Sequence, residues 1–342
     1  MSNAPMIFAP CPDGMRLGLG GAPLGNLFRP VSESDASDVL QAALADGCCS
    51  FDTAPHYGHG LSEHRFGRSV RSLPRDRLTI SSKVGRLLTP DETTPRAQNG
   101  YVDILPFRQH WDYSASGVRR SVEDSLQRLG LARLDAVFIH DCDSASHGDA
   151  YHAVVEQVVS EAIPELQRMK REGLLRAVGL GVNDTQVCLD VQKRAELDCL
   201  LLAGRYTLLD QAGLPELLPL CAERGIRIAI GGVFNSGILA TGVRAAGQPP
   251  VFNYGPAGRD WIDRTRRIEE ICENFGVPLR AAALQFPLAH PSVEIALVGA
   301  HHRDQWADAV AMMRHHVPNA FWRALQQAAL LPTDAPVPEE AT

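Results

Sequence analysis

Polar side chains end three apolar segments that lie far apart in the chain. The run CCSFD ends in Asp52, LTISSK reaches Lys83 and LDAVFIH ends in His140, while Tyr57 follows Asp52 within FDTAPHYGHG. A charged group at the edge of an apolar core is costly unless it has a partner. If the three segments are neighbouring strands, their ends meet at one rim. The four residues are therefore a candidate catalytic group.

These residue types suit proton transfer to or from a carbinol. A phenol has a pKa of about 10, and an ammonium within about 4 Å favours the phenolate and lowers that pKa. Lys83 can supply the ammonium with Asp52 as its counter-ion, and His140 can donate to a carbonyl or carbinol oxygen. Tyr57 would then be the acid in reduction and the base in oxidation. Because such a shuttle has neither nucleophile nor metal, it needs a hydride partner, which implies a nicotinamide cofactor.

Each of the four residues also has an ordinary structural interpretation. A strand-end Asp commonly caps a turn, a Lys extends to water, and a His or Tyr packs in the core. Their convergence at adjacent strand ends favours the catalytic interpretation. HDCD at 140–143 could instead ligate a metal, but we predict no metal site. No serine nucleophile elbow or P-loop is present.

The elements that must position these residues alternate between apolar strand segments and helical periodicity. Eight strands with intervening helices indicate parallel βα units and favour an α/β fold, the closed (β/α)8 TIM barrel. A doubly wound sheet is the alternative, but GLGGAPLG after the first segment lacks the spacing of a dinucleotide fingerprint. Ser32 and Ser114 are the expected caps of two helices. The expected strands are 15–20, 48–53, 78–84, 134–140, 177–182, 199–205, 226–233 and 294–299, and the expected helices are 33–46, 115–130, 150–172, 184–196, 213–224, 261–275 and 303–314.

Three connections, 85–113, 141–149 and 235–260, are too long for simple turns, and each follows a strand. In a barrel such loops gather at the C-terminal end of the strands, where active sites are built. We expect one barrel domain over 1–331 and a disordered tail over 332–342. An extra C-terminal helix should cover the barrel or its mouth, or form a homodimer face. Its apolar residues are Phe321, Trp322, Leu325 and Leu330.

Composition argues against several kinds of partner. The 342 residues have a formal net charge of -7 and scattered basic residues, so we expect no nucleic-acid or anionic-membrane partner. No apolar stretch reaches the roughly 18 residues of a membrane helix. The N-terminus MSNAPMIFAP lacks a secretion signal. The 8 cysteines form no Cys-x-x-Cys, so a reducing cytoplasm is expected.

Longer motifs around these residues resemble the aldo-keto reductase superfamily. They are FDTAPHYGHGLSEHRFGR, SSKVGR, GVRRSVEDSLQRLGLARLDAVFIHD and LLAGRYTLLDQ, and the resemblance runs from about residue 15 to about residue 315. It implies a (β/α)8 barrel and a catalytic tetrad of Asp, Tyr, Lys and His. These positions match Asp52, Tyr57, Lys83 and His140.

Other motifs look most like the aldose 1-dehydrogenase branch, which includes L-fucose, D-threo-aldose and pyridoxal 4-dehydrogenases. The branch implies oxidation of a cyclic hemiacetal at C1 to a lactone, with hydride passing to the nicotinamide. Pyridoxal, itself a cyclic hemiacetal in water, or a simple aldehyde is an alternative substrate. A nucleotide-sensing regulatory subunit of a membrane channel is a further alternative. The motifs are GGAPLGNL, APHYG, DYS, AGRYTLLDQ, GGVFNSGILA and ALQFPLAHP.

The resemblance also implies cofactor contacts. Asn183 matches the Asn that holds the nicotinamide carboxamide, and Tyr206 or Phe234 would replace the usual stacking aromatic. His301 stands where NADPH-using relatives carry Lys or Arg, and Arg303 is the only firm charge nearby. A largely neutral imidazole pairs poorly with a dianionic phosphate, so we predict NAD rather than NADP. The other expected contacts are Gly21, Asn235, Ser236, Gly237, Gly299, Ala300 and Gln305.

Substrate contacts are expected from the long loops. Trp111 could form a wall for the apolar face of a sugar ring, because sugars pack their C–H faces on aromatic rings. His56, Arg86, Arg205 and Asn235 could bind hydroxyl groups. Each of these residues could equally make an ordinary loop contact.

Overall fold

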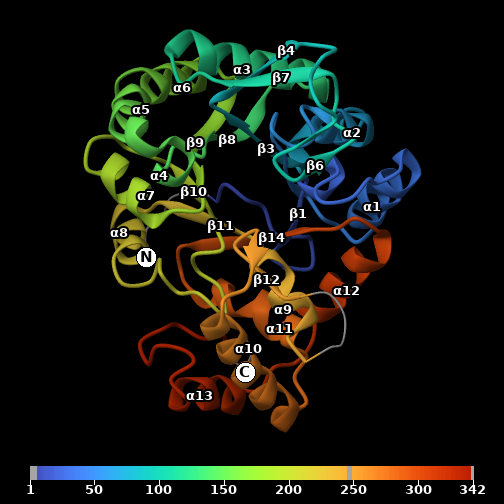
Figure 1. The fold of residues 1–342 in the computed structure, drawn as a ribbon, viewed down its shortest axis with the longest axis vertical. Helices are drawn as coiled ribbons and strands as arrows, with labels where there is room; N and C mark the ends of the chain where they lie inside the picture. Colours follow the sequence, from blue (N-terminus) through green and yellow to red (C-terminus); the bar gives the residue numbers. More distant parts are fainter. Residues whose placement is uncertain (1–5, 245–248, 340–342) are drawn as a thin grey trace.

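Eight parallel strands close into a barrel in the computed structural model, which describes residues 6–244 and 249–339 (Figure 1). The last strand pairs with the first strand, so the sheet has no edge. This arrangement confirms the predicted barrel, and every predicted strand segment overlaps a barrel strand. In order around the barrel the strands are β1 (Leu17–Gly20), β2 (Ser50–Asp52), β3 (Thr79–Val84), β8 (Leu134–His140), β9 (Leu175–Val182), β10 (Cys199–Ala203), β11 (Arg227–Gly231) and β14 (Val293–Gly299).

The barrel interior is packed with apolar side chains and closed at its N-terminal end. Phe8, from the segment before β1, is buried in this cluster, and its ring lies 6.2 Å from that of Phe138. The backbone amides of Ile7 and Phe8 donate to Glu294 Oε2 at 3.0 and 2.9 Å. The N-terminal segment therefore forms a floor under the barrel. The other buried members of the cluster are Ala136, Ala177, Cys199, Leu201, Ala229, Ile295 and Leu297.

Helices surround the barrel and cover the outer faces of its strands. The Ser32 and Ser114 side chains accept from the amides of Asp35 and Gly117, which confirms both predicted caps. The predicted helix at 150–172 is helical throughout but contains a π-helical turn at Val158–Ala162. The longer helices are α1 (Glu33–Ala45), α2 (Leu61–Val70), α3 (Ala115–Leu129), α5 (Tyr151–Gln157), α6 (Ile163–Arg171), α7 (Thr185–Gln192), α8 (Leu217–Arg224), α10 (Arg259–Phe275), α11 (Leu279–Gln285), α12 (Arg303–Met313) and α13 (Asn319–Gln327).

The three long connections contain secondary structure that the sequence did not predict. Residues 85–113 form an antiparallel hairpin of β4 (Arg86–Pro90) and β7 (Phe107–Trp111), visible beside α3 in Figure 1. A smaller pair, β5 (Ala97–Gln98) and β6 (Tyr101–Val102), lies between them. The connection after β8 holds α4 (Ser144–His147). The connection after β11 holds α9 (Ile238–Thr241) and the hairpin of β12 (Val251–Phe252) and β13 (Gly255–Pro256).

The C-terminal helix α13 packs against α10 (Figure 1). Phe321, Trp322, Leu325 and Leu330 are all buried within the chain, so they do not form the exposed dimer face that was one expectation. The expected disordered tail is also corrected, because residues 332–339 have a defined course. Ala335 is buried, and its carbonyl is one of three from this segment that accept from the Gln326 side chain. Residues 340–342 lie outside the described part of the chain.

Among residues 6–244 and 249–339, no helix is long and apolar enough to cross a membrane. Over the same ranges, no group of three or more His, Cys, Asp or Glu side chains is placed to hold a metal ion. The 8 cysteines are free thiols and all but Cys49 are buried.

Candidate active site

Three adjacent barrel strands carry an Asp, a Lys and a His to the C-terminal end of the barrel. Asp52 ends β2, Lys83 is next to last in β3, and His140 ends β8. Lys83 Nζ donates to Asp52 Oδ2 at 2.6 Å and to the Thr53 carbonyl at 2.9 Å. The Ser81 hydroxyl donates to Asp52 Oδ1 at 2.7 Å. Both members of this ion pair are buried, so each provides the charge partner that burial requires.

Tyr57 lies in the connection between β2 and α2, next to the ion pair. Lys83 Nζ is 4.6 Å from the centroid of its ring. The ring centroids of Tyr57 and His140 are 6.1 Å apart and their planes are nearly perpendicular at 82°. The ring of Tyr101, from β6, stacks on the ring of Tyr57, with the two centroids 6.0 Å apart. The structure thus brings the four residues of the candidate tetrad together at one rim.

The expected effect of Lys83 on the acidity of Tyr57 is corrected by this geometry. Burial raises the pKa of the Tyr57 phenol well above its usual value, and the nearby Asp52 carboxylate raises it further. The ammonium does not reverse the direction because its charge is matched by Asp52 at 2.6 Å. Tyr57 is therefore a neutral phenol, and a proton donor, in the resting protein at neutral pH.

Two imidazoles at the rim are held neutral. Burial lowers the pKa of His140 well below its usual value, and the positive charges of Arg86 and Lys83 lower it further. Burial also lowers the pKa of His56 to about 3, with the Arg86 charge as the next contribution. His56 Nδ1 lies 2.9 Å from the Gln109 side-chain oxygen, and the His56 and His140 rings are 5.8 Å apart. Neither imidazole adds a positive charge near Tyr57 at neutral pH.

The expected substrate contacts divide into those at the rim and those already engaged. His56 lies beside Tyr57, and Trp111, 41% exposed, stacks over the Arg86 guanidinium at 3.9 Å. Arg205 is engaged elsewhere, since its guanidinium donates to the Asn183 carbonyl, to Asp210 and to the Asn253 side chain. These bonds tie the β12–β13 hairpin to the ends of β9 and β10. Arg205 therefore holds loops together and is not free for a substrate hydroxyl.

Several expected cofactor contacts are likewise engaged within the chain. Tyr206 is fully buried, and its ring packs 5.2 Å from that of Phe286, so it cannot stack on a ligand. Asn235 is 4% exposed and bonds the Thr207 hydroxyl at 2.6 Å and the Gly204 carbonyl at 3.2 Å. These two expectations are corrected, because both side chains serve the packing of the loops after β10 and β11.

Other expected cofactor residues lie where a ligand can reach them. Phe234 is partly exposed, and Ser236 Oγ accepts from the Tyr254 amide at 2.9 Å. Gly237 has φ +106°, and a Cβ there would meet no atom within 4 Å. The Asn183 side chain hydrogen-bonds that of Tyr254. The loop after β11 therefore presents accessible backbone at Gly237, and the Asn183 amide lies directly after β9.

The loops after β1 and β14 meet at another part of the rim. His301 Nε2 lies 3.0 Å from the Leu27 carbonyl, and its amide donates to the Gln305 side chain at 2.8 Å. Burial lowers the pKa of His301, so this imidazole is neutral. Arg29 lies close enough for its charge to be felt at His301, which adds a cation beyond the expected Arg303.

Three small residues of these loops differ in what they do. Gly299 is exposed beside the loop after β1, and Ala300 is fully buried. A Cβ on Gly21 would lie 2.5 Å from Ser62 Oγ and 2.7 Å from Phe66, both in α2. The absence of a side chain at Gly21 is thus required by packing against α2.

Sequence reasoning missed the residues that complete this rim. Tyr101 and Gln109 come from the β5–β6 and β4–β7 hairpins, and Tyr254 comes from the β12–β13 hairpin. Asp141 follows His140 with φ +46°, a left-handed conformation uncommon for a residue with a side chain. Only Asp141 had a sequence signal, because HDCD placed it directly after a strand-end His. The others lie on connections whose course no local pattern encodes.

Residues 16–329 match the family model described as aldo/keto reductase family. The chain belongs to this family. Aldo-keto reductases are oxidoreductases of CH–OH or carbonyl groups and use nicotinamide cofactors. The tetrad described above is therefore set in the expected barrel of an aldo-keto reductase.

Two similar curated proteins are named as dehydrogenases. The chain is 42% identical to pyridoxal 4-dehydrogenase of Microbacterium luteolum over 92% of this chain and 94% of that protein. It is 38% identical to D-threo-aldose 1-dehydrogenase of a Pseudomonas species over 93% and 94% of the two chains. Among solved structures, glycerol dehydrogenase from Gluconobacter oxydans superposes with a TM-score of 0.72 at 21% identity, covering 96% of this chain and 94% of that one. This last likeness concerns the fold alone.

The residues at the rim fit a nicotinamide cofactor. The Asn183 amide can pair with a carboxamide, because an amide side chain both donates and accepts. The open space at Gly237 lets a phosphate approach the backbone closely. Gln305 and His301 hold the loop after β14 through the 2.8 Å bond between them. These residues would line the cofactor along the ends of β9, β11 and β14.

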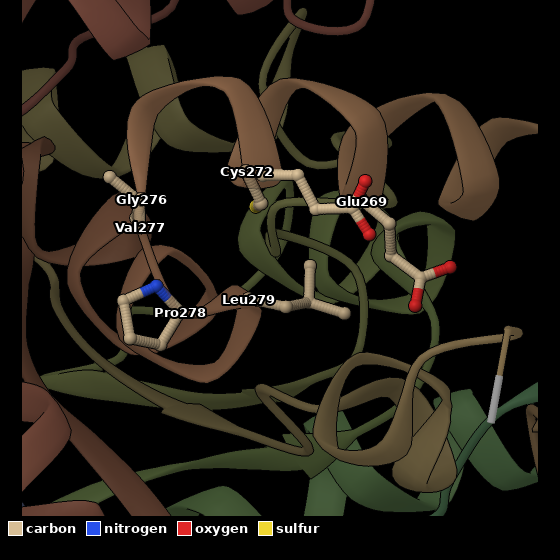
Figure 2. Close-up of a pocket in the computed structure, with 7 residues that line it drawn as sticks. Glu269, Cys272, Gly276, Val277, Pro278 and Leu279 are labelled. Carbon is tan, nitrogen blue, oxygen red and sulfur yellow. The ribbon is translucent and has the colours of Figure 1, made fainter.

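A separate cavity of about 370 Å³ lies between α10 and α11 and shares no residue with this rim (Figure 2). It is lined by Glu269, Cys272, Glu273 and residues 276–279. Burial raises the pKa of the Cys272 thiol to about 12, so this cysteine is not a reactive thiolate. None of these lining residues is a Tyr, a Lys or a His, the residue types that meet Asp52 at the rim.

Proposed function

We propose that this aldo-keto reductase oxidises the hemiacetal carbinol of an aldose, of the L-fucose or D-threo-aldose type, at C1 to the lactone. NAD is the proposed hydride acceptor. The observation that carries the proposal is the meeting of Tyr57 with the Lys83–Asp52 pair and His140 at one rim. The 38% identity to a D-threo-aldose 1-dehydrogenase supports the substrate class.

Each residue has a defined part in this reaction. When bound, the nicotinamide accepts the hydride from the carbinol carbon. Tyr57 takes the proton of the carbinol hydroxyl, so that the C–O bond becomes the lactone carbonyl. His140, neutral and buried, donates to the same oxygen and orients it. Lys83 Nζ lies 4.6 Å from the centroid of the Tyr57 ring, so its ammonium is the cation next to the phenolate that must form before each oxidation, although Asp52 offsets much of its charge.

The NAD preference is supported by the loop after β14. A 2′-phosphate needs a permanent cation or a guanidinium fork. His301 stands at the position concerned, and it is neutral and bonded to the Leu27 carbonyl. Arg29 is the cation that could weaken this preference, because it lies near His301. We therefore expect kcat/KM with NAD to exceed that with NADP, and Arg29→Gln to lower only the NADP value.

Pyridoxal is a second candidate substrate. The 42% identity to a pyridoxal 4-dehydrogenase favours it. The exposed Trp111 ring, with His147 only 4.5 Å away, also offers an aromatic surface for a pyridine ring. In water pyridoxal is a cyclic hemiacetal, so the same tetrad would oxidise it with the same proton and hydride movements.

One panel separates these proposals. L-fucose, D-arabinose, L-galactose and pyridoxal are each offered with NAD and with NADP, and reduced cofactor is followed by absorbance. We expect the highest kcat/KM with an aldose and NAD. A higher value with pyridoxal would establish the second candidate. No reduction of either cofactor by any of the four would refute the dehydrogenase proposal for this substrate class.

A further inference from the structure

An arginine lies behind the imidazole of the tetrad. Arg86 begins β4, directly after Gly85, whose φ is +104° and whose Cβ would lie 2.4 Å from the Tyr113 ring. This turn, which only glycine fits, leads the chain from β3 into β4. Arg86 Nη1 is 3.0 Å from His140 Nδ1 and 2.8 Å from Asp141 Oδ2. The Arg86 side chain is 12% exposed, so these contacts are shielded from solvent.

The chemistry of this contact determines where the imidazole carries its hydrogen. A guanidinium has five N–H donors and no acceptor. Its contact with His140 Nδ1 therefore requires that nitrogen to be the acceptor. A neutral imidazole that accepts at Nδ1 bears its hydrogen on Nε2. Asp141 does not compete for that hydrogen, since its Oδ2 is 3.6 Å from His140 Nε2 and is bonded to Arg86.

Further contacts fix the positions of Arg86 and His140 relative to each other. The central carbon of the Arg86 guanidinium lies 3.9 Å from the centroid of the Trp111 ring, and this cation–π contact helps to hold the side chain in place. The Tyr113 hydroxyl donates to the His140 carbonyl at 2.8 Å. The backbone amide of Asp141 donates to the Gly181 carbonyl of β9 at 3.1 Å. Trp111 and Tyr113, at and after the end of β7, and Gly181 of β9 therefore hold Arg86 and the end of β8 in place.

We infer that Arg86 is a positioning residue that fixes His140 as the Nε2–H tautomer and so makes it a hydrogen-bond donor to the substrate oxygen. The inference deepens the proposed function, on which its catalytic consequence rests, and it reassigns Arg86 from the expected contact with a substrate hydroxyl. Without the Nη1–H donor, Nδ1 is free to take the hydrogen, and Nε2 would then be an acceptor facing an oxygen. The tautomer itself is a property of the protein alone.

The positive charges around His140 also favour its neutral form. Arg86 from β4 and Lys83 from β3 are positive, whereas His56 and Tyr57 face it as neutral rings. Asp141 is the only carboxylate within ion-pair distance among the described residues, and Arg86 binds it. Burial together with the two cations lowers the pKa of His140. Loss of Arg86 would leave Asp141 unpaired beside the imidazole, so the pKa of His140 would move upwards.

The test compares Arg86→Met, which keeps an apolar stem over Trp111, with Arg86→Lys, which keeps a cationic donor. Arg108→Met is the matched control, because Arg108 lies on the same hairpin but pairs with Asp91 at the surface. Nitrogen-15 NMR of the histidine rings, assigned with His140→Gln, reports the tautomer in the free protein. We expect a pyrrole-type Nε2 and a pyridine-type Nδ1 in the wild type, in Arg86→Lys and in Arg108→Met.

In Arg86→Met we expect a mixture of tautomers and a His140 titration that moves to higher pH. With the best substrate of the panel, kcat should fall at least about tenfold while KM changes little, and Arg86→Lys should recover much of kcat. A rise in KM with unchanged kcat and an unchanged tautomer would overturn the inference in favour of a substrate contact. If Arg86→Met does not fold, a wild-type spectrum with the hydrogen on Nδ1 still refutes it.

The NMR result also separates this inference from the proposed function. A tautomer change in Arg86→Met, combined with no turnover of any panel substrate by the wild type, would leave the role of Arg86 intact and remove the dehydrogenase proposal. Turnover by the wild type with no tautomer change would do the reverse.

Discussion

The ammonium of Lys83 and the carboxylate of Asp52 lie 2.6 Å apart, so their charges largely cancel at the Tyr57 ring. Tyr57 therefore keeps its proton at neutral pH, and burial raises its pKa. A neutral phenol suits reduction as it stands, whereas oxidation first requires its deprotonation. We therefore expect oxidation, and not reduction, to depend on deprotonation of Tyr57.

Removal of the Tyr57 hydroxyl should stop turnover without displacing the cofactor. We expect Tyr57→Phe to lower kcat by about 100-fold or more, because a positioned acid or base contributes at least that factor. The ring contacts with Tyr101 and His140 remain, so the Kd for NADH, measured by fluorescence, should be unchanged. Turnover at the wild-type rate would assign the proton to another group.

The pH dependence of oxidation follows from the raised pKa of Tyr57. The base form is a small fraction below the pKa and grows about tenfold per pH unit. We expect kcat for sugar oxidation to rise from about pH 7 to about pH 10 without a plateau, because the pKa lies above its usual value of about 10. A flat profile over this range would contradict a rate-determining role for the phenol.

The sequence predicted residues at strand ends better than residues on loops. Asp52, Lys83 and His140 each lie at or next to the end of a barrel strand, and parallel strands place such ends at one rim. Asn235 and Arg205 were misassigned because their bonding partners, Thr207 and Asn253, come from loops with no periodic pattern. A polar side chain on such a loop gives no local sign of whether backbone or ligand satisfies it.

Among the elements, β9 depends on a glycine for its approach to β10. A Cβ on Gly179 would lie 2.1 Å from the Cys199 carbonyl oxygen, which belongs to the paired strand. The Cys199 carbonyl belongs to the backbone of β10 and cannot turn aside as a flexible side chain could. We therefore expect Gly179→Ala to push the two strands apart and to lower the free energy of unfolding by about 1–3 kcal/mol. Urea denaturation measures this change.

The control for that variant is Gly255→Ala, because a Cβ there would meet no atom within 4 Å. We expect its free energy of unfolding to match that of the wild type. Equal stability of both variants would show that the β9–β10 pairing tolerates a side chain at position 179.

The barrel strands could be predicted because they are buried on both faces, so they appear as apolar runs. The two-stranded ribbon β4–β7 could not, since only Leu87 and Leu88 of its ten residues are buried and the ribbon includes Pro90. Ribbons of this kind are stabilised by what they pack on rather than by their own pattern. The helix α11 was missed for a similar reason, because LRAAALQ is short and its alanines carry little periodic signal.

At the scale of the whole molecule, the lowered pKa values of His56 and His140 make the free energy of unfolding depend on pH. The pKa of His56 is lowered to about 3, whereas in the unfolded chain it is near 6.5. Below about pH 6.5 the unfolded chain binds a proton that the folded chain does not, so the free energy of unfolding falls as pH falls. His140 is shifted in the same direction.

We expect the free energy of unfolding to fall by about 2 kcal/mol between about pH 7 and about pH 5 through His56 alone. His56→Gln should remove that share of the loss, as measured by urea denaturation at both pH values. The same slope in the variant and in the wild type would show that His56 does not control acid sensitivity.

Phe8 fills the N-terminal end of the barrel, and the Glu294 carboxylate accepts a hydrogen bond from its backbone amide. If the proposed reaction is right, substrate, product and cofactor must all reach the tetrad from the C-terminal end of the barrel, because the N-terminal end is filled by Phe8. A molecule bound at the C-terminal end of the barrel would then hinder both substrate binding and product release.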